Sequence, residues 1–194
     1  MEKLTKAITN WLIENGAIED RDSELYEYAI YSMLITISPL VLVLIIAIGM
    51  GTALEGIIMI LPFMCIRKFS GGYHAKHPGV CFVSSCVILV FCMWLATHLE
   101  YSYWTTVITT GCVLFLCMNS PIDSEHKRLD NMEKRNYKKI AIILSGIFYV
   151  IHCICGGIGL EKGANCLAVG ICLTAILQLP CLYQLHSESR KGTV

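Results

Sequence analysis

Residues 29–50 read AIYSMLITISPLVLVLIIAIGM, an apolar run without a single charged side chain. A helix needs about 20 such residues to cross a hydrocarbon core of about 30 Å. A strand or an amphipathic helix of a soluble domain would instead show apolar residues at period 2 or 3.6. The run therefore predicts a membrane-spanning helix.

The rest of the chain repeats this pattern. Of its 194 residues, 55% are hydrophobic and only 15% charged, which is far more apolar than an ordinary soluble domain. Apolar segments alternate with short polar segments that hold nearly all the Lys and Arg residues, so we expect an all-α, polytopic integral membrane protein with about six transmembrane helices. The apolar segments are residues 29–50, 53–66, 80–97, 103–118, 140–158 and 164–182.

The second segment is the weakest, because it is short and contains Glu55 and Pro62. A tilted span, a re-entrant segment and a helix shielded by its neighbours all fit it. The positive-inside rule favours six spans. When both termini and the loops 67–79 and 119–139 are placed in the cytoplasm, Lys162 is the only Lys or Arg residue on the outer side. We expect one membrane domain over residues 1–194.

Residues 1–16 predict an amphipathic helix that lies in the membrane interface. A helix packed on cytoplasmic loops is the alternative. The apolar stripe consists of Leu4, Ala7, Ile8, Trp11 and Leu12.

Most of the eleven cysteines lie in apolar runs and are expected to act as small hydrophobic residues, not as a disulfide framework. His152, Cys153 and Cys155 are too tightly spaced for a zinc site. We expect neither a metal nor another cofactor.

Residues 67–81 read RKFSGGYHAKHPGVC and form the most unusual polar segment. Gly71 and Gly72 permit backbone conformations or close approaches that larger residues resist, and Pro78 suits the first turn of a helix. Cys81 would then lie at the start of the third span, where unpaired amides and the helix dipole favour a thiolate.

His74 is our first choice as the base that pairs with Cys81, and His77 is the second. The competing interpretation is a glycine turn with an interfacial histidine and a buried thiol.

The pattern of Arg67, Gly71-Gly72-Tyr73-His74-Ala75 and Cys81 resembles the accessory gene regulator B (AgrB) family, in which a Cys follows a Gly-Gly-x-His motif by seven residues. The chain length, the N-terminal helix, the spans and residues 119–123 (NSPID) are also similar to that family. One departure is that residues 124–129 read SEHKRL, without an Asn-Lys-Pro-like run.

The resemblance implies a bacterial cell-membrane cysteine endopeptidase of quorum sensing. Cys81 would attack a short AgrD-like precursor peptide, His74 would transfer the protons, and the C-terminal tail would leave. An internal Cys or Ser of the precursor would then close a thiolactone or lactone ring on the Cys81 thioester. A homodimer is also what the family leads us to expect.

Other roles around this segment stay open. Three interpretations fit Arg67: contact with an acidic precursor tail, bracing of the loop, or anchoring of the membrane topology. Two fit the basic residues in 127–139, which are binding of the precursor tail and binding of anionic lipid headgroups. Asp123 orients His74 or caps the loop after Pro121. We expect lipids, but not nucleic acid, as partners.

A small membrane transporter is the main alternative function. Transport pathways place ionisable residues inside the spans, and Glu55 is the main candidate here. A structural or assembly factor would leave the Gly-Gly-x-His and Cys81 arrangement unexplained.

Overall fold

The computed structural model describes residues 2–71, 78–122 and 130–183, and within these ranges it contains helices and no strand. This confirms the all-α class. The elements are α1 (Glu2–Glu14), the 3-10 helix η1 (Asp20–Asp22), α2 (Ser23–Gly49), α3 (Ala53–Ser70), α4 (Pro78–His98), α5 (Tyr103–Asn119), α6 (Asn131–Gly157) and α7 (Glu161–Ile176).

Each predicted apolar segment falls on one of the helices α2 to α7, but the bounds differ most at three helix ends. Helix α2 begins at Ser23, before the predicted start at residue 29. Helix α6 begins at Asn131, well before the apolar run that starts at residue 140. The backbone N–H of Asp130 donates to Glu133 Oε2 at 3.3 Å, as in a capping box, which starts the helix in a polar segment. Helix α7 ends at Ile176, before the end of its apolar run.

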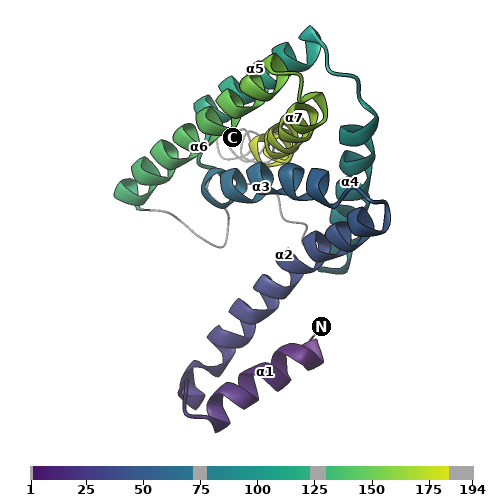
Figure 1. Cartoon of the computed structure of the whole chain (residues 1–194). Helices are drawn as coiled ribbons and strands as arrows, with labels where there is room; N and C mark the ends of the chain where they lie inside the picture. Colours follow the sequence, from purple (N-terminus) through teal and green to yellow (C-terminus); the bar gives the residue numbers. More distant parts are fainter. Residues whose placement is uncertain (1, 72–77, 123–129, 184–194) are drawn as a thin grey trace.

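Helix α7 lies at the centre of the molecule, where α3, α4, α5 and α6 pack against it (Figure 1). Nearly every residue from Ala164 to Ala175 is buried. Gly170 allows α3 to approach closely, because a Cβ there would lie 2.8 Å from Pro62 Cγ. Small residues at such crossings let two helix backbones meet.

Helices α1 and α2 form a hairpin that projects from the remaining helices (Figure 1). Thr5 and Thr9 of α1 are buried, whereas Leu4 and Trp11 are 54% and 60% exposed. These two residues of the predicted apolar stripe are thus left uncovered by the described part of the chain. An interfacial position of α1 stays a prediction.

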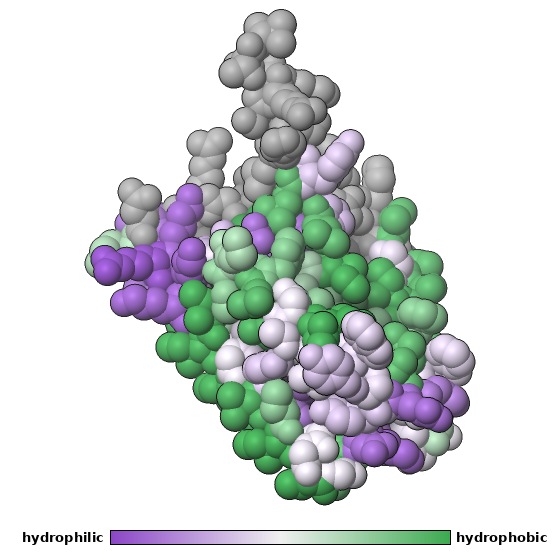
Figure 2. Space-filling model, turned by 90° about the horizontal axis from the view of Figure 1, so that it is seen from above, coloured by the Kyte–Doolittle hydropathy of each residue, from purple (hydrophilic) through white to green (hydrophobic). Residues whose placement is uncertain are grey.

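Among the described residues, two helical stretches are long and apolar enough to cross a membrane, and this is consistent with a membrane protein. They are Met132–Gly157 and Glu161–Tyr183, the second of which consists of α7, the turn at residues 177–178 and the helical residues 179–183. Shorter apolar helices cover Leu40–Gly49, Phe82–His98 and Tyr103–Asn119. Figure 2 shows a broad hydrophobic surface, with strongly hydrophilic residues gathered in separate areas at its margins. The count of six spans stays a prediction.

Candidate active site

The predicted site residues are spread over described and undescribed parts of the chain. Arg67 lies in the last turn of α3 and Gly71 is the residue that ends this helix. Cys81 lies in α4. Gly72, His74, His77 and Asp123 fall outside the described residues, so the contact between His74 and Cys81 stays a prediction.

Helix α4 begins at Pro78, which places Cys81 in its first turn. Proline suits this position because it has no backbone N–H and its φ angle is already helical. The first backbone N–H groups of a helix have no partner within it and carry the positive end of the helix dipole. The backbone of Cys81 therefore lies where a thiolate would be stabilised.

Three distant segments meet at the end of α3, in what we call the α3 junction: Ser70, Gly71, Ser120, Ile122 and Gln178. The Ile122 backbone N–H donates to the Ser70 carbonyl at 3.0 Å. The Gln178 side-chain Nε2 donates to the same carbonyl at 2.9 Å and to Ser120 Oγ at 3.0 Å. The side chains of Ser70, Ser120, Ile122 and Gln178 are all buried. Two of the described ranges, which end at Gly71 and at Ile122, thus end next to each other in this junction.

Gly71 meets two separate constraints at the junction. Its backbone has φ +76° and ψ −172°, a conformation that is almost restricted to glycine. A Cβ at this position would also lie 2.6 Å from the Ile122 carbonyl oxygen, which is closer than van der Waals contact allows. Glycine is therefore required here both for the turn and for the close approach of residues 120–122.

Gln178 reaches the junction because α7 is interrupted. Pro180 has no backbone N–H to donate to the carbonyl of Ile176, and its ring clashes with a continuing helix. The helix ends at Ile176, and the Gln178 N–H donates to the Ala175 carbonyl at 3.1 Å. Gln178 and Ser120 were not among the site residues predicted from the sequence. The available signal was a polar residue two positions before a proline in an apolar run.

Basic residues gather near the junction on two helices. The Arg67 guanidinium lies over the Phe63 ring, with Cζ 5.5 Å from the ring centroid. Phe69 of α3 packs edge-on against Tyr137 of α6, with their centroids 5.6 Å apart, so the first turns of α6 adjoin the end of α3. The basic residues on these two stretches are Arg67, Lys68, Lys134, Arg135, Lys138 and Lys139.

The surroundings of His152 differ from those of a metal-binding histidine. Its ring is buried, and Nδ1 lies 2.9 Å from the carbonyl of Ala164, which can only accept, so Nδ1 donates. Nε2 lies 3.5 Å from Thr106 Oγ1. Both ring nitrogens are thus used in joining α5, α6 and α7. Within the residues that the structure describes, no group of three His, Cys, Asp or Glu residues is placed to hold a metal ion.

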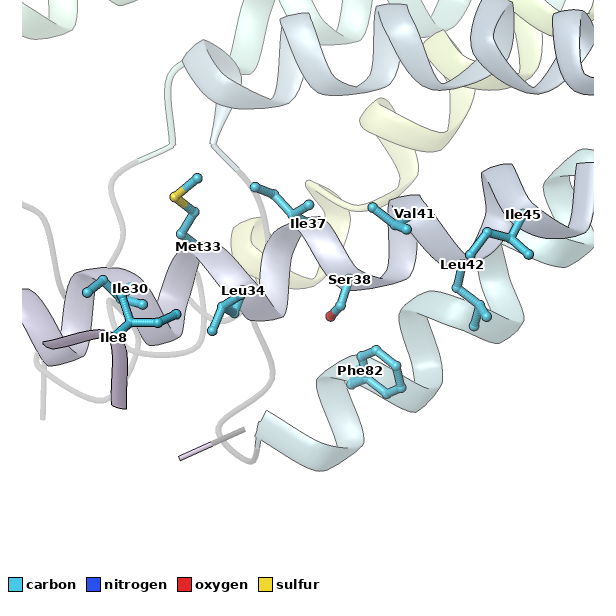
Figure 3. Close-up of a pocket in the computed structure, with 10 residues that line it drawn as sticks. All are labelled: Ile8, Ile30, Met33, Leu34, Ile37, Ser38, Val41, Leu42, Ile45 and Phe82. Carbon is cyan, nitrogen blue, oxygen red and sulfur yellow. The ribbon is translucent and has the colours of Figure 1, made fainter. Parts of the chain in front are cut away.

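An apolar groove of about 650 Å³ lies along α2, between α1 and α4. Figure 3 shows Phe82 of α4 pointing towards Ser38 and Leu42 of α2, while Ile8 comes from α1. Ser38 is the single polar residue among those that line it. The groove borders the start of α4, but its lining offers no acid and no base that could activate the Ser38 hydroxyl.

Comparison with known proteins gives a consistent result. The family model of accessory gene regulator B matches residues 5–179. Accessory gene regulator protein B of Staphylococcus lugdunensis is 27% identical over 141 residues, which cover 71% of this chain and 72% of the relative. The putative AgrB-like protein of Clostridium acetobutylicum is 26% identical over 194 residues, 99% of this chain and 91% of the relative. The putative AgrB-like protein 2 of Clostridium perfringens is 22% identical over 147 residues, 72% and 69% of the two chains. No solved structure matches.

Proposed function

Because this chain belongs to the accessory gene regulator B family, we propose that it is a membrane cysteine endopeptidase that matures a small quorum-sensing precursor peptide. Family membership itself gives the chain a role in the accessory gene regulator system and an association with an AgrD-type precursor. The cysteine chemistry and the ring closure are the parts that we add.

In the proposed reaction, the Cys81 thiolate attacks the carbonyl carbon of the scissile peptide bond. His74 accepts the thiol proton and then gives it to the leaving amine, which departs with the C-terminal tail. The retained peptide stays on Cys81 as a thioester. A Cys or Ser side chain of the peptide then attacks that carbonyl, the Cys81 thiolate leaves, and a thiolactone or lactone ring forms.

The observation that carries this proposal is the position of Cys81 in the first turn of α4, three residues after Pro78. Unpaired amides and the helix dipole act on this residue, while most of the other cysteines lie deeper in the apolar helices. The glycine-dependent junction at the end of α3 supports a constrained start for the segment that holds His74.

The basic residues near the junction fit two roles within this function. An acidic precursor tail would be attracted to Arg67, Lys68 and the first turns of α6. The same residues would equally hold this end of the molecule at anionic lipid headgroups on the cytoplasmic side. We assign Asp123 one of two alternative roles, orienting His74 or capping the loop after Pro121.

The corresponding location is a multi-pass position in the bacterial cell membrane, with both termini and the catalytic segment at the cytoplasmic face. The strongly one-sided distribution of Lys and Arg supports it. A homodimer belongs to the same proposal and rests on the family alone.

The test is co-expression of the full chain with the small peptides encoded beside its gene, followed by mass spectrometry of the peptides. We expect one peptide to lose its C-terminal tail. Because the product is cyclic, its mass should be that of the linear cleaved peptide less one molecule of water. Cys81→Ala should abolish this product. Cys86→Ala, a thiol on the same helix, should leave it unchanged. Unchanged cleavage by Cys81→Ala would overturn the mechanism, and export of an uncleaved peptide would favour a transporter.

A further inference from the structure

Helix α2 is covered unevenly along its length. Among the residues whose burial the structure describes, the buried ones of this helix are Leu40, Val43 and Ala47, which all lie in its second half. The first half belongs to the hairpin that projects from the remaining helices, where α1 is the helix beside it (Figure 1). A long apolar face of α2 is therefore left uncovered within the described part of the chain.

This face carries a ridge and a groove side by side. A row of exposed apolar side chains at spacings of four and three residues forms what we call the α2 ridge: Met33, Ile37, Val41, Ile45 and Ile48. The apolar groove follows the next row of the same helix, with Leu34, Ser38 and Leu42, and Phe82 of α4 lies on its other side (Figure 3). Rows of side chains four residues apart are the ridges and grooves by which helices pack on one another. A second helix with such a ridge fits the groove, and α2 itself has that ridge.

Ser38 favours a helix over a lipid chain as the occupant of the groove. Its Oγ is buried among apolar side chains and has no hydrogen-bond partner within the described residues. An acyl chain offers neither a donor nor an acceptor, whereas a helix brings polar groups, and serine hydroxyls bond across helices in membranes. Residues 29–50 contain no charged side chain, so two copies of this helix approach each other without charge repulsion.

We propose that this face of α2 is the interface with a second copy of this chain, in which the α2 ridge of each copy lies in the groove of the other. Such a contact is isologous, because one patch supplies both complementary surfaces, and it closes at two copies. The homodimer in the proposed function rests on the family alone, and this inference gives it a location. It takes from that function only the membrane position of α2 and does not depend on the cysteine chemistry.

The test is disulfide cross-linking of the full-length chain in native membranes. Val41 lies at the middle of the α2 ridge, so the two copies of this residue meet where the helices cross. In Val41→Cys, copper phenanthroline and oxygen take two electrons and two protons from the paired thiols, which leaves a disulfide-linked dimer. We expect at least about fivefold more of this dimer than in the wild-type chain, because a disulfide requires Cα atoms within about 7 Å of each other. Ile37→Cys, one turn earlier on the ridge, should behave in the same way.

Val150→Cys is the matched control. Val150 is another exposed valine of an apolar helix, 55% exposed against 47% for Val41, but it lies on α6. It should give no more dimer than the wild-type chain, in which the native thiols set the background. Background levels of dimer in both Val41→Cys and Ile37→Cys would overturn the inference.

Photo-cross-linking identifies the occupant independently. When p-benzoylphenylalanine takes the place of Ile45, an exposed residue that lines the groove, light joins it to the molecule that lies against it. A mass of the adduct that equals two copies of the chain supports the interface, and an adduct with a phospholipid or a small peptide in its place would overturn it. None of these experiments needs a precursor peptide. Failure of peptide cleavage therefore leaves the interface standing, and failure of the cross-links leaves the cysteine chemistry standing.

Discussion

Replacing Gly71 with alanine should open the α3 junction. The φ of +76° and ψ of −172° cost a residue with a Cβ about 1–3 kcal/mol. The new Cβ would lie 2.6 Å from the Ile122 carbonyl oxygen, so residues 120–122 must move. That movement would break the bond from the Ile122 N–H to Ser70, which is worth about 0.5–1.5 kcal/mol net. Together these costs are about 1.5–4.5 kcal/mol, which corresponds to roughly a 10- to 2000-fold change in the ratio of open to closed junction.

Amide hydrogen exchange of the purified chain checks this value, because the exchange rate at Ile122 rises in proportion to the opened fraction. Gly51→Ala is the matched control. Gly51 has a similar φ of +71°, but a Cβ there would meet nothing within 4 Å. Gly51→Ala therefore has only a backbone cost of about 1–2 kcal/mol, and this cost applies outside the α3 junction. Exchange at Ile122 that stays at the wild-type rate in Gly71→Ala would refute the reasoning.

Two further substitutions test the base and the helix packing. His74→Ala should abolish precursor cleavage while His77→Ala retains it, because His74 is the expected base; mass spectrometry of the peptide shows which holds, and the opposite pattern would assign the base to His77. Gly170→Ala should destabilise the protein by about 1–3 kcal/mol, because its Cβ would overlap Pro62 and the Met59 carbonyl. Gly146→Ala on α6 meets nothing within 4 Å and should stabilise by up to about 1 kcal/mol. Thermal unfolding measures both, and equal stability of the two variants would contradict the packing at Gly170.

The sequence predicted the helices well because each is specified locally. Long apolar runs have few alternatives to a helix, and every one of them falls on α2 to α7. Hydropathy alone did not give several of the helix ends, and at two of them other interactions determine where the helix begins or ends. Helix α6 starts in a polar stretch that Asp130 and Glu133 cap, and α7 stops early because of Pro180.

The candidate site also has some features that the local sequence predicts and others that it does not. The start of α4 at Pro78 could be predicted from a local signal, since proline favours the first position of a helix. The bond between Gln178 and Ser70 joins residues 108 positions apart, and no periodicity or motif connects them. Gly71 was recognised as a turn residue, but its contact with Ile122 depends on the packing of α5 and α7 around α3. Such contacts follow only from the assembled fold.

The interruption of α7 has a consequence for how the protein is made. Ser70 leaves the ribosome 108 residues before Gln178, which at about 5–20 residues per second is an interval of roughly 5–20 s. During that interval α3 has been synthesised, but its end lacks the amide that closes the junction. Biosynthesis therefore sets an order of events in which the end of α3 receives its bond from Gln178 last, after nearly the whole chain has been translated. A nascent chain that ends before Gln178 contains both α3 and residues 120–122 but lacks the amide that bonds Ser70 and Ser120.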